Sequence, residues 1–142
     1  MKQLLLKIIT QEKELLQEEV DSVTIPTVDG EITVLPQHIP LFTRIQVGEV
    51  TFRIGEQVHS VVVANGFTDV GPNNVVTIMT DTAIRSADID ILRAEEAKRR
   101  AQEAMLQKLD ERDFVLAEAS LRKALMEIQA YNKHKKLSWF NL

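Results

Sequence analysis

The chain has 142 residues, 44% of them hydrophobic and 27% charged, with a formal net charge of −4 and no cysteine. This length supports one ordinary domain or two small ones that share a core, and the lack of cysteine excludes a disulfide framework and a thiolate zinc site. The acidic balance argues against a nucleic-acid partner, and no apolar run reaches the roughly 18 residues of a membrane-spanning helix.

The N-terminal run MKQLLLKIITQ predicts a first strand. Lys7 interrupts its apolar residues, and charges follow at Glu12, Lys13 and Glu14, which is a poor pattern for a signal peptide. We therefore expect a cytosolic chain that reaches a membrane only through a partner.

Residues 23–42, VTIPTVDGEITVLPQHIPLF, predict two short strands and two turns. Pro26 closes the first apolar run, and Asp29-Gly30 forms a turn before the second run. Two further prolines bracket His38. Because proline cannot donate into a strand ladder, we expect this segment at a sheet edge or on a loop face.

The following segment predicts a β-hairpin and further short strands. Residues 50–54 alternate between apolar and polar, and Gly55-Glu56 favours a type II′ turn to a partner strand at residues 58–64. Asn65-Gly66 predicts another turn, and residues 75–79 predict another strand. Since all glycines and prolines lie at or before position 72, the first half is predicted to be a β-sandwich or flattened barrel.

After residue 87 the apolar period becomes helical. Two stripes step by three and four residues: Ala94, Ala97, Ala101 and Ala104, and then Phe114, Ala117, Leu121, Ala124, Ile128 and Tyr131. Either Asp110 or Asp113 is expected to cap the second helix. Because the small side chains of the first stripe bury little area, this antiparallel hairpin is expected to be weakly held. The predicted domains are therefore residues 1–86 and residues 87–142.

The segment around His38 resembles the signature loop of the epsilon subunit of F-type ATP synthases, whose pattern is P-G-x-x-G-E-x-G-V-L-P-x-H-A-P-L-L. The matching residues are Pro26, Gly30, Glu31, Val34, Leu35, Pro36, His38, Pro40 and Leu41. Thr27, Thr33 and Ile39 depart from the pattern. Residues 64–70, ANGFTDV, resemble the family's G-G-F-x-E-V segment, and residues 81–85 resemble its junction with the first helix. This resemblance implies a β-sandwich followed by a helical hairpin, in a stalk subunit of a rotary motor.

Residues for bond chemistry are not grouped in this sequence. The three histidines lie in different predicted elements without metal-ligand spacing, and neither a nucleophile elbow nor a P-loop occurs. The pattern therefore predicts a non-catalytic protein with no metal site and no required cofactor.

His38 has two interpretations. It is either a polar residue that caps its own turn, or part of a face that contacts another protein, formed by Glu31, His38, Ile39, Leu41 and Phe42. The family resemblance implies that this end of the sandwich contacts the c ring beside the gamma subunit. A proline-stiffened loop suits that role, because a preordered loop loses less entropy on binding.

Residues 89–94, IDILRA, match the I/L-D-x-x-R-A pattern with which some bacterial epsilon subunits bind ATP. The resemblance implies a nucleotide site formed by Ile89, Asp90, Arg93, Ala94, Arg100 and Lys123. Helical spacing puts Asp90, Arg93 and Arg100 on one face, where two guanidiniums suit phosphate oxygens. Alternatively, Asp90 simply pairs with Arg93 at a solvated helix start. Glu127 stands where ATP-binding members carry an arginine, which predicts weakened binding.

The last ten residues, KHKKLSWFNL, have two interpretations. They are either a frayed terminus or a basic segment, including Lys135, Lys136 and Trp139, that grips an acidic groove of the catalytic subunits or a membrane surface. The resemblance gives no guidance past about Tyr131.

We therefore expect the central-stalk epsilon subunit of a proton-transporting F-type ATP synthase. Its sandwich would join gamma to the proton- or sodium-driven c ring, and its hairpin would be a mobile arm that inhibits ATP hydrolysis when extended among the alpha and beta subunits. Regulatory ATP would favour the folded hairpin. We expect a peripheral location on the cytoplasmic side of the inner (plasma) membrane, within the complex. The alternatives are a free-standing nucleotide-binding sensor and a generic adaptor with no rotor partner.

Overall fold

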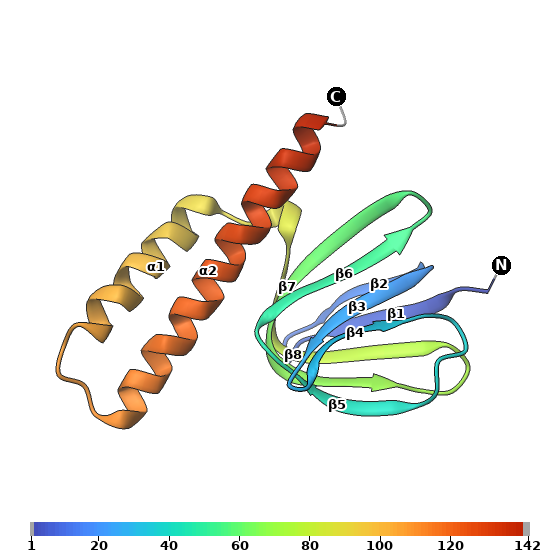
Figure 1. The fold of residues 1–142 in the computed structure, drawn as a ribbon, viewed down its shortest axis with the longest axis horizontal. Coiled ribbons are helices and arrows are strands. Elements are labelled where there is room, and N and C mark those ends of the chain that lie inside the picture. Colours follow the sequence, from blue (N-terminus) through green and yellow to red (C-terminus); the bar gives the residue numbers. More distant parts are fainter. Residues whose placement is uncertain (1, 141–142) are drawn as a thin grey trace. The chain divides into compact units, whose positions relative to one another are not determined.

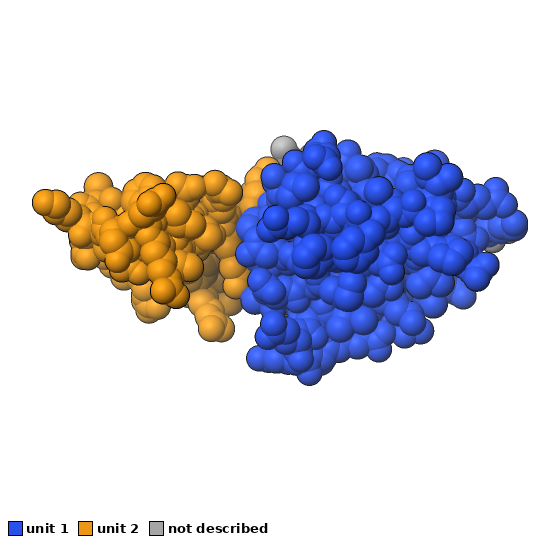
Figure 2. All heavy atoms as spheres, turned by 90° about the horizontal axis from the view of Figure 1, so that it is seen from below, with its two compact units in different colours: residues 1–85 blue, residues 86–142 orange. Residues whose placement is uncertain are grey.

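The computed structural model describes residues 2–140, and the side chains of residues 2–135. The chain divides into two compact units, Met1–Arg85 and Ser86–Leu142 (Figure 2). Within the described residues the first unit holds the strands and the second holds the helices. The predicted fold class, a β-sandwich followed by a helical hairpin, is confirmed.

Eight strands make up the first unit (Figure 1). They are β1 (Leu4–Ile9), β2 (Glu14–Val20), β3 (Ser22–Thr27), β4 (Gly30–Val34), β5 (Leu41–Ile45), β6 (Gly48–Ile54), β7 (Gln57–Val70) and β8 (Val75–Arg85). Their order is β2-β1-β8-β7-β5-β3-β4, while β6 pairs with both β3 and β7. Strands β1 and β8 are parallel and the other pairs are antiparallel. Since β4 ends the strand order, Pro36 and Pro40 lie in the loop that follows an edge strand, as predicted, whereas Pro26 lies in β3, between β4 and β5.

The core of this unit follows from period-2 alternation. In β1 the side chains of Leu4, Leu6 and Ile8 are buried while the residues between them are half-buried. The same alternation in the other strands completes the core with Leu16, Val20, Val23, Ile25, Val34, Ile45, Val50, Phe52, Val61, Val63, Val70, Val76 and Ile78. Each fully buried aliphatic side chain contributes roughly 1.5–3 kcal/mol. Strand β2 was not predicted because only Leu16 and Val20 of its seven residues are buried.

The predicted turn at Asn65-Gly66 is wrong. Both residues lie inside β7, which pairs with β6 up to Val63 and with β5 from Gly66 onward. Asn65 has φ 59° and Gly66 has φ 134°, so the strand bends there without reversing. Figure 1 shows the first part of β7 beside β6 and its later part beside β5. The positive φ values that favour a turn also allow a strand to change sheets at a corner.

The hydroxyl of Thr80 lies under this corner of the sandwich. Its Oγ1 is 2.6 Å from the Asn65 carbonyl oxygen and 3.1 Å from those of Ala64 and Thr82. A Cβ on Gly66 would lie 2.0 Å from the Met79 carbonyl oxygen. The corner therefore requires glycine for the close approach of β8 as well as for its backbone angle.

The other predicted turns hold with one shift. Gly55-Glu56 joins β6 to β7 in the predicted two-residue hairpin, with φ 63° at Gly55, as a type II′ turn requires. The turn between β3 and β4 consists of Val28 and Asp29, because Gly30 already pairs with Thr27. The turn was therefore predicted one residue too late.

The second unit contains a short 3₁₀ helix η1 (Ser86–Asp88), helix α1 (Ile91–Met105) and helix α2 (Glu111–Phe140). Figure 1 shows α1 and α2 antiparallel and side by side. Asp90 caps α1 by accepting hydrogen bonds from the backbone N–H groups of Leu92 and Arg93. Asp110 Oδ1 accepts from the backbone N–H of Asp113 at 2.8 Å, so Asp110 is the cap of α2. Each helix is thus preceded by an aspartate, a favoured N-cap residue.

Alanines are the most buried of the described side chains in α1 and α2. Ala94, Ala101, Ala124 and Ala130 are at most 5% exposed. Two positions of the predicted stripes are wrong: Ala97 is exposed, and Phe114 is 40% exposed. The packed face of α1 instead passes through half-buried Lys98, four residues after Ala94, because a helix repeats its face at either three or four residues.

Candidate functional site

The loop between β4 and β5 has a defined backbone conformation. The backbone N–H of His38 donates to the Leu35 carbonyl oxygen at 3.1 Å, which closes a four-residue turn with Pro36 in its second position. Gln37, in the third position, has φ 70°. These angles are typical of a type II turn, in which proline favours the second position and a left-handed residue occupies the third.

The His38 side chain folds back on this loop. Its Nδ1 lies 2.6 Å from the Ile39 carbonyl oxygen, so this nitrogen carries the proton and donates. Both interpretations of His38 are therefore compatible with the structure, since the ring supports its own loop and is only half-buried.

An exposed apolar surface begins at this loop and continues across the sheet. Ile39 is 76% exposed, Phe42 is 62% exposed, and the Phe42 ring stacks on Phe67 with 5.4 Å between centroids. Met79 lies directly opposite Phe67 in the strand pairing and is 39% exposed. We call Ile39, Phe42, Phe67 and Met79 the apolar surface. Neighbouring Leu35 and Leu41 are 56% and 37% exposed.

Sequence reasoning missed Phe67 and Met79. A signal was present, because Phe67 lies two residues after the polar Asn65 and two residues before the polar Asp69. Side chains two residues apart lie on the same face of a strand. The mistaken turn at Asn65 prevented this interpretation.

Glu31 is separated from the rest of the predicted interface. It lies in β4 beside Pro26 of β3, and is exposed, so the expectation of a common loop with His38 is wrong. Val34, where β4 ends, is three residues after Glu31, about 10 Å along the strand. The loop itself brings His38 and Ile39 next to Leu41 and Phe42, which begin β5.

The residues predicted to bind nucleotide occupy different surroundings. Asp90 uses its carboxylate to cap α1, whereas Arg93 and Arg100 are exposed on the helix. Arg100 forms an ion pair with Glu96 at 2.6 Å. Two exposed guanidiniums on one helix surface suit phosphate oxygens, but the cap bonds compete for the Asp90 carboxylate.

The apolar members of the predicted nucleotide site are covered. Ile89 precedes α1 and is 7% exposed, and Ala94 is 2% exposed. Because Ala94 is buried, its small side chain leaves no open space for a base or ribose in this structure. Lys123 and Glu127 lie four residues apart on α2, both half-buried.

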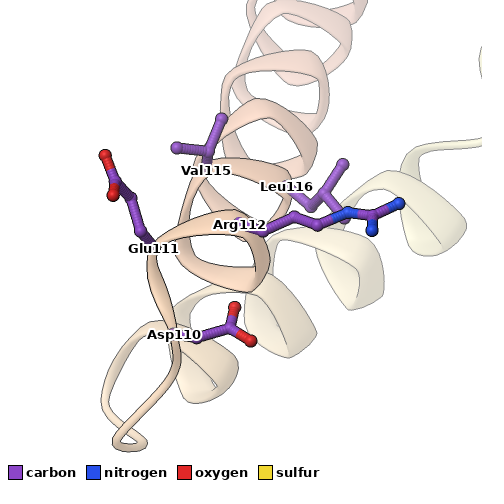
Figure 3. Close-up of a pocket in the computed structure, with 5 residues that line it drawn as sticks. All are labelled: Asp110, Glu111, Arg112, Val115 and Leu116. Atoms are coloured by element: carbon purple, nitrogen blue, oxygen red, sulfur yellow. The ribbon is translucent and has the colours of Figure 1, made fainter.

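A separate open pocket lies at the start of α2. Its volume is about 560 Å³, and Figure 3 shows the five residues that line it: Asp110, Glu111, Arg112, Val115 and Leu116. The Asp110 carboxylate beside the first turn is occupied as the helix cap. None of the predicted site residues lines this pocket.

Neither metal ligands nor a membrane-spanning segment is found in the described part of the chain. No three His, Asp or Glu side chains among the described residues are grouped as a metal site would require. Neither described helix combines the length and apolar character of a membrane span.

Together, these features define a class of protein: a β-sandwich with an exposed apolar loop end, joined to a two-helix hairpin. The family model for the β-sandwich domain of the ATP synthase delta/epsilon chain matches residues 3–86, and that for its long α-helix domain matches residues 87–132. The chain belongs to the epsilon chain family of F-type ATP synthases, as the resemblance predicted.

Relatives of similar length support this assignment. The chain is 42% identical to the ATP synthase epsilon chain of Dehalococcoides mccartyi over 137 residues, which cover 96% of this chain and 97% of the relative. It is 37% identical to that of Syntrophobacter fumaroxidans over 128 residues, covering 90% and 95% respectively. A chain in the OSCP/F1/c-ring structure of Euglena gracilis mitochondrial ATP synthase aligns with a TM-score of 0.75 and 28% identity, covering 86% of this chain and 77% of that one.

Proposed function

We propose that this chain is a non-catalytic central-stalk subunit that joins gamma to the c ring and regulates ATP hydrolysis. The observation that carries the proposal is the apolar surface, whose four side chains are between 39% and 76% exposed. Exposed apolar residues that lie together mark interaction sites, and three of these four are held in strands. The similar Euglena chain belongs to an assembly of OSCP, F1 and the c ring, which supports partners of this kind.

The hairpin is proposed to be the regulatory arm. Its helices have their own caps, and their described side chains form exposed i,i+4 ion pairs, among them Arg99–Glu103, Arg100–Glu96 and Arg122–Glu118. Such pairs support a helix by only a few tenths of a kcal/mol each, but they do so without tertiary packing. Together with an alanine-based contact, this favours helices that keep their structure when the hairpin opens.

In the extended state, α2 would insert among the alpha and beta subunits and block rotation. Basic residues on this helix would favour acidic loops there: Arg122, Lys123, Lys133, Lys135 and Lys136. The side chains of Lys136 and Trp139 lie outside the described residues, so their part in this contact is inferred from the sequence alone.

ATP is proposed to be a regulatory ligand rather than a required cofactor. Arg93 and Arg100 would meet the phosphates, with Lys123 adding charge from α2. The occupied Asp90 carboxylate and buried Ala94 mean that binding would require local rearrangement, which lowers the apparent affinity.

The alternative, a free-standing nucleotide sensor or adaptor, is less well supported. Both parts of the chain match the epsilon chain family, and such a sensor has no use for the apolar surface. A peripheral location on the cytoplasmic side of the membrane follows from the proposed partners.

Co-purification tests the proposal. Phe42→Asp should reduce recovery of gamma and the c ring with the tagged chain, because a charge would be buried at the interface. Val58→Asp is the matched control, since Val58 is 51% exposed in β7 but lies outside the apolar surface. Equal recovery with both variants would contradict the proposed interface, and absence of gamma with the unaltered chain would favour the alternative.

A further inference from the structure

We propose that Asn74 is a positioning residue that sets the conformation of the β4–β5 loop and thereby presents Ile39 to the partner. The inference rests on the proposed function for the partner contact, whereas the positioning itself rests on geometry. Asn74 Oδ1 accepts a hydrogen bond from the backbone N–H of Gln37 at 2.6 Å, across 37 residues of sequence.

Asn74 connects three segments at one end of the sandwich. Its side chain holds the β4–β5 loop at Gln37, and its backbone carbonyl oxygen accepts from the Leu5 N–H of β1 at 2.8 Å. The residue itself belongs to the turn between β7 and β8. The strand register agrees, since Val70 at the end of β7 pairs with both Leu41 and Val76. Figure 1 shows the β4–β5 loop and the β7–β8 turn at the same end.

The loop needs this support because of Gln37. Its φ of 70° is unfavourable for a residue with a Cβ, and glycine or asparagine is usual in the third position of a type II turn. The turn's own hydrogen bond uses the N–H of His38, not that of Gln37. The Asn74 side chain therefore supplies a bond that offsets part of the cost of the left-handed conformation of Gln37.

Asparagine also suits position 74 for its own backbone. Asn74 has φ 63°, and asparagine tolerates this region better than most residues. Asn73 has φ 64°, but its exposed side chain makes no hydrogen bond to any described residue. The two adjacent asparagines thus share a backbone conformation and differ in the contact to the loop.

This difference provides a matched pair of variants. Asn74→Gly and Asn73→Gly both keep a residue that accepts positive φ, and only the first removes the bond to Gln37. In the full-length chain we expect Asn74→Gly to speed hydrogen exchange of the Gln37 amide about 3- to 10-fold, the equivalent of one neutral hydrogen bond. Asn74→Gly should also weaken binding to the gamma–c-ring assembly. Asn73→Gly should change neither, and Asn74→Asp, which keeps the acceptor oxygen, should restore both.

The outcomes separate this inference from the proposed function. Unchanged exchange at Gln37 in Asn74→Gly would overturn the positioning role. Faster exchange with unaltered partner binding would overturn the link between loop and partner. If Phe42→Asp also leaves binding unaltered, the proposed interface itself fails. Exchange of the buried Ile78 amide in each variant verifies that the sandwich remains folded.

Discussion

At the scale of single residues, Gly66 has the most demanding position in the sandwich. Two constraints meet there: a φ of 134° and a Met79 carbonyl oxygen 2.0 Å from where a Cβ would lie. The oxygen belongs to the backbone of a neighbouring strand, so it cannot move aside as a flexible side chain could. The constraint comes from the packing of β7 on β8 as well as from local backbone preference.

Gly66→Ala is therefore expected to destabilise the chain by about 3 kcal/mol or more, since backbone strain adds to overpacking. Gly55→Ala is the control: its φ is 63° with no atom within 4 Å of the added Cβ, so the cost should be about 1 kcal/mol. Urea unfolding of both variants measures the difference. Equal losses would show that the corner yields more easily than its geometry implies.

Asp21 connects the start of β1 to the β6–β7 hairpin. Its carboxylate accepts from the Gly55 backbone N–H at 2.7 Å and from the Gln3 side-chain amide at 3.1 Å. The Gly55 bond, followed by that from Gln3, lowers the pKa of Asp21 below its usual value. The ionised carboxylate is therefore the form that the folded state favours.

This lowered pKa predicts a pH-dependent contribution to stability. The contribution is fully present above the unfolded-state pKa of about 3.9 and is lost as the pH falls through the folded-state pKa. Asp21→Ala should lower the melting temperature at pH 7, and the gap from the unaltered chain should close toward pH 2. Thermal unfolding at both values checks this. A gap that stays constant with pH would indicate that the charge of Asp21 is not involved.

At the scale of elements, the start of α1 combines two roles for one residue. Asp90 caps the helix, yet it also belongs to the segment that resembles an ATP-binding motif. Asn is as good a cap as Asp, so Asp90→Asn removes the charge while it retains the cap. This separates helix stability from ligand recognition.

We expect the isolated chain to bind ATP more tightly than ADP, because the additional phosphate gives the two arginines more charge to meet. Arg93→Ala should cost on the order of 1.5–3 kcal/mol, typical of a charge-assisted hydrogen bond, while Glu127→Arg should strengthen binding. Asp90→Asn should leave helix content unchanged and report whether the carboxylate contributes. Titration calorimetry measures all four proteins. If neither the unaltered chain nor Glu127→Arg gives heat with millimolar ATP, residues 89–94 are an ordinary helix start and not part of a nucleotide site.

At the scale of the whole molecule, the two units have separate hydrophobic contacts. The core of the first unit is drawn entirely from β1 to β8, and the buried alanines of the hairpin lie on α1 and α2. A core that needs no residue from the hairpin should persist when the hairpin is removed.

Deleting every residue after Asp88 should leave a folded sandwich that still binds gamma, with ATP hydrolysis by the complex raised or unchanged. The prediction combines the independent core with the proposed inhibitory role of α2. Circular dichroism, gamma binding and hydrolysis assays test its three parts. An unfolded product would show that the hairpin is structural, and reduced hydrolysis by an intact complex would contradict inhibition.

Much of the architecture was determined by the sequence itself. Period-2 alternation, the clustering of glycine and proline before residue 73 and the later helical period predict a sandwich and a hairpin, because these patterns reflect local backbone geometry and side-chain direction. The family resemblance rests on ordered short motifs, which are equally local. The tertiary structure decided how distant segments meet: the corner at Asn65-Gly66, the stacking of Phe42 on Phe67, and the bond from Gln37 to Asn74. A positive φ permits a turn or a bent strand alike, and only the pairing of β7 with β5 and β8 selects between them.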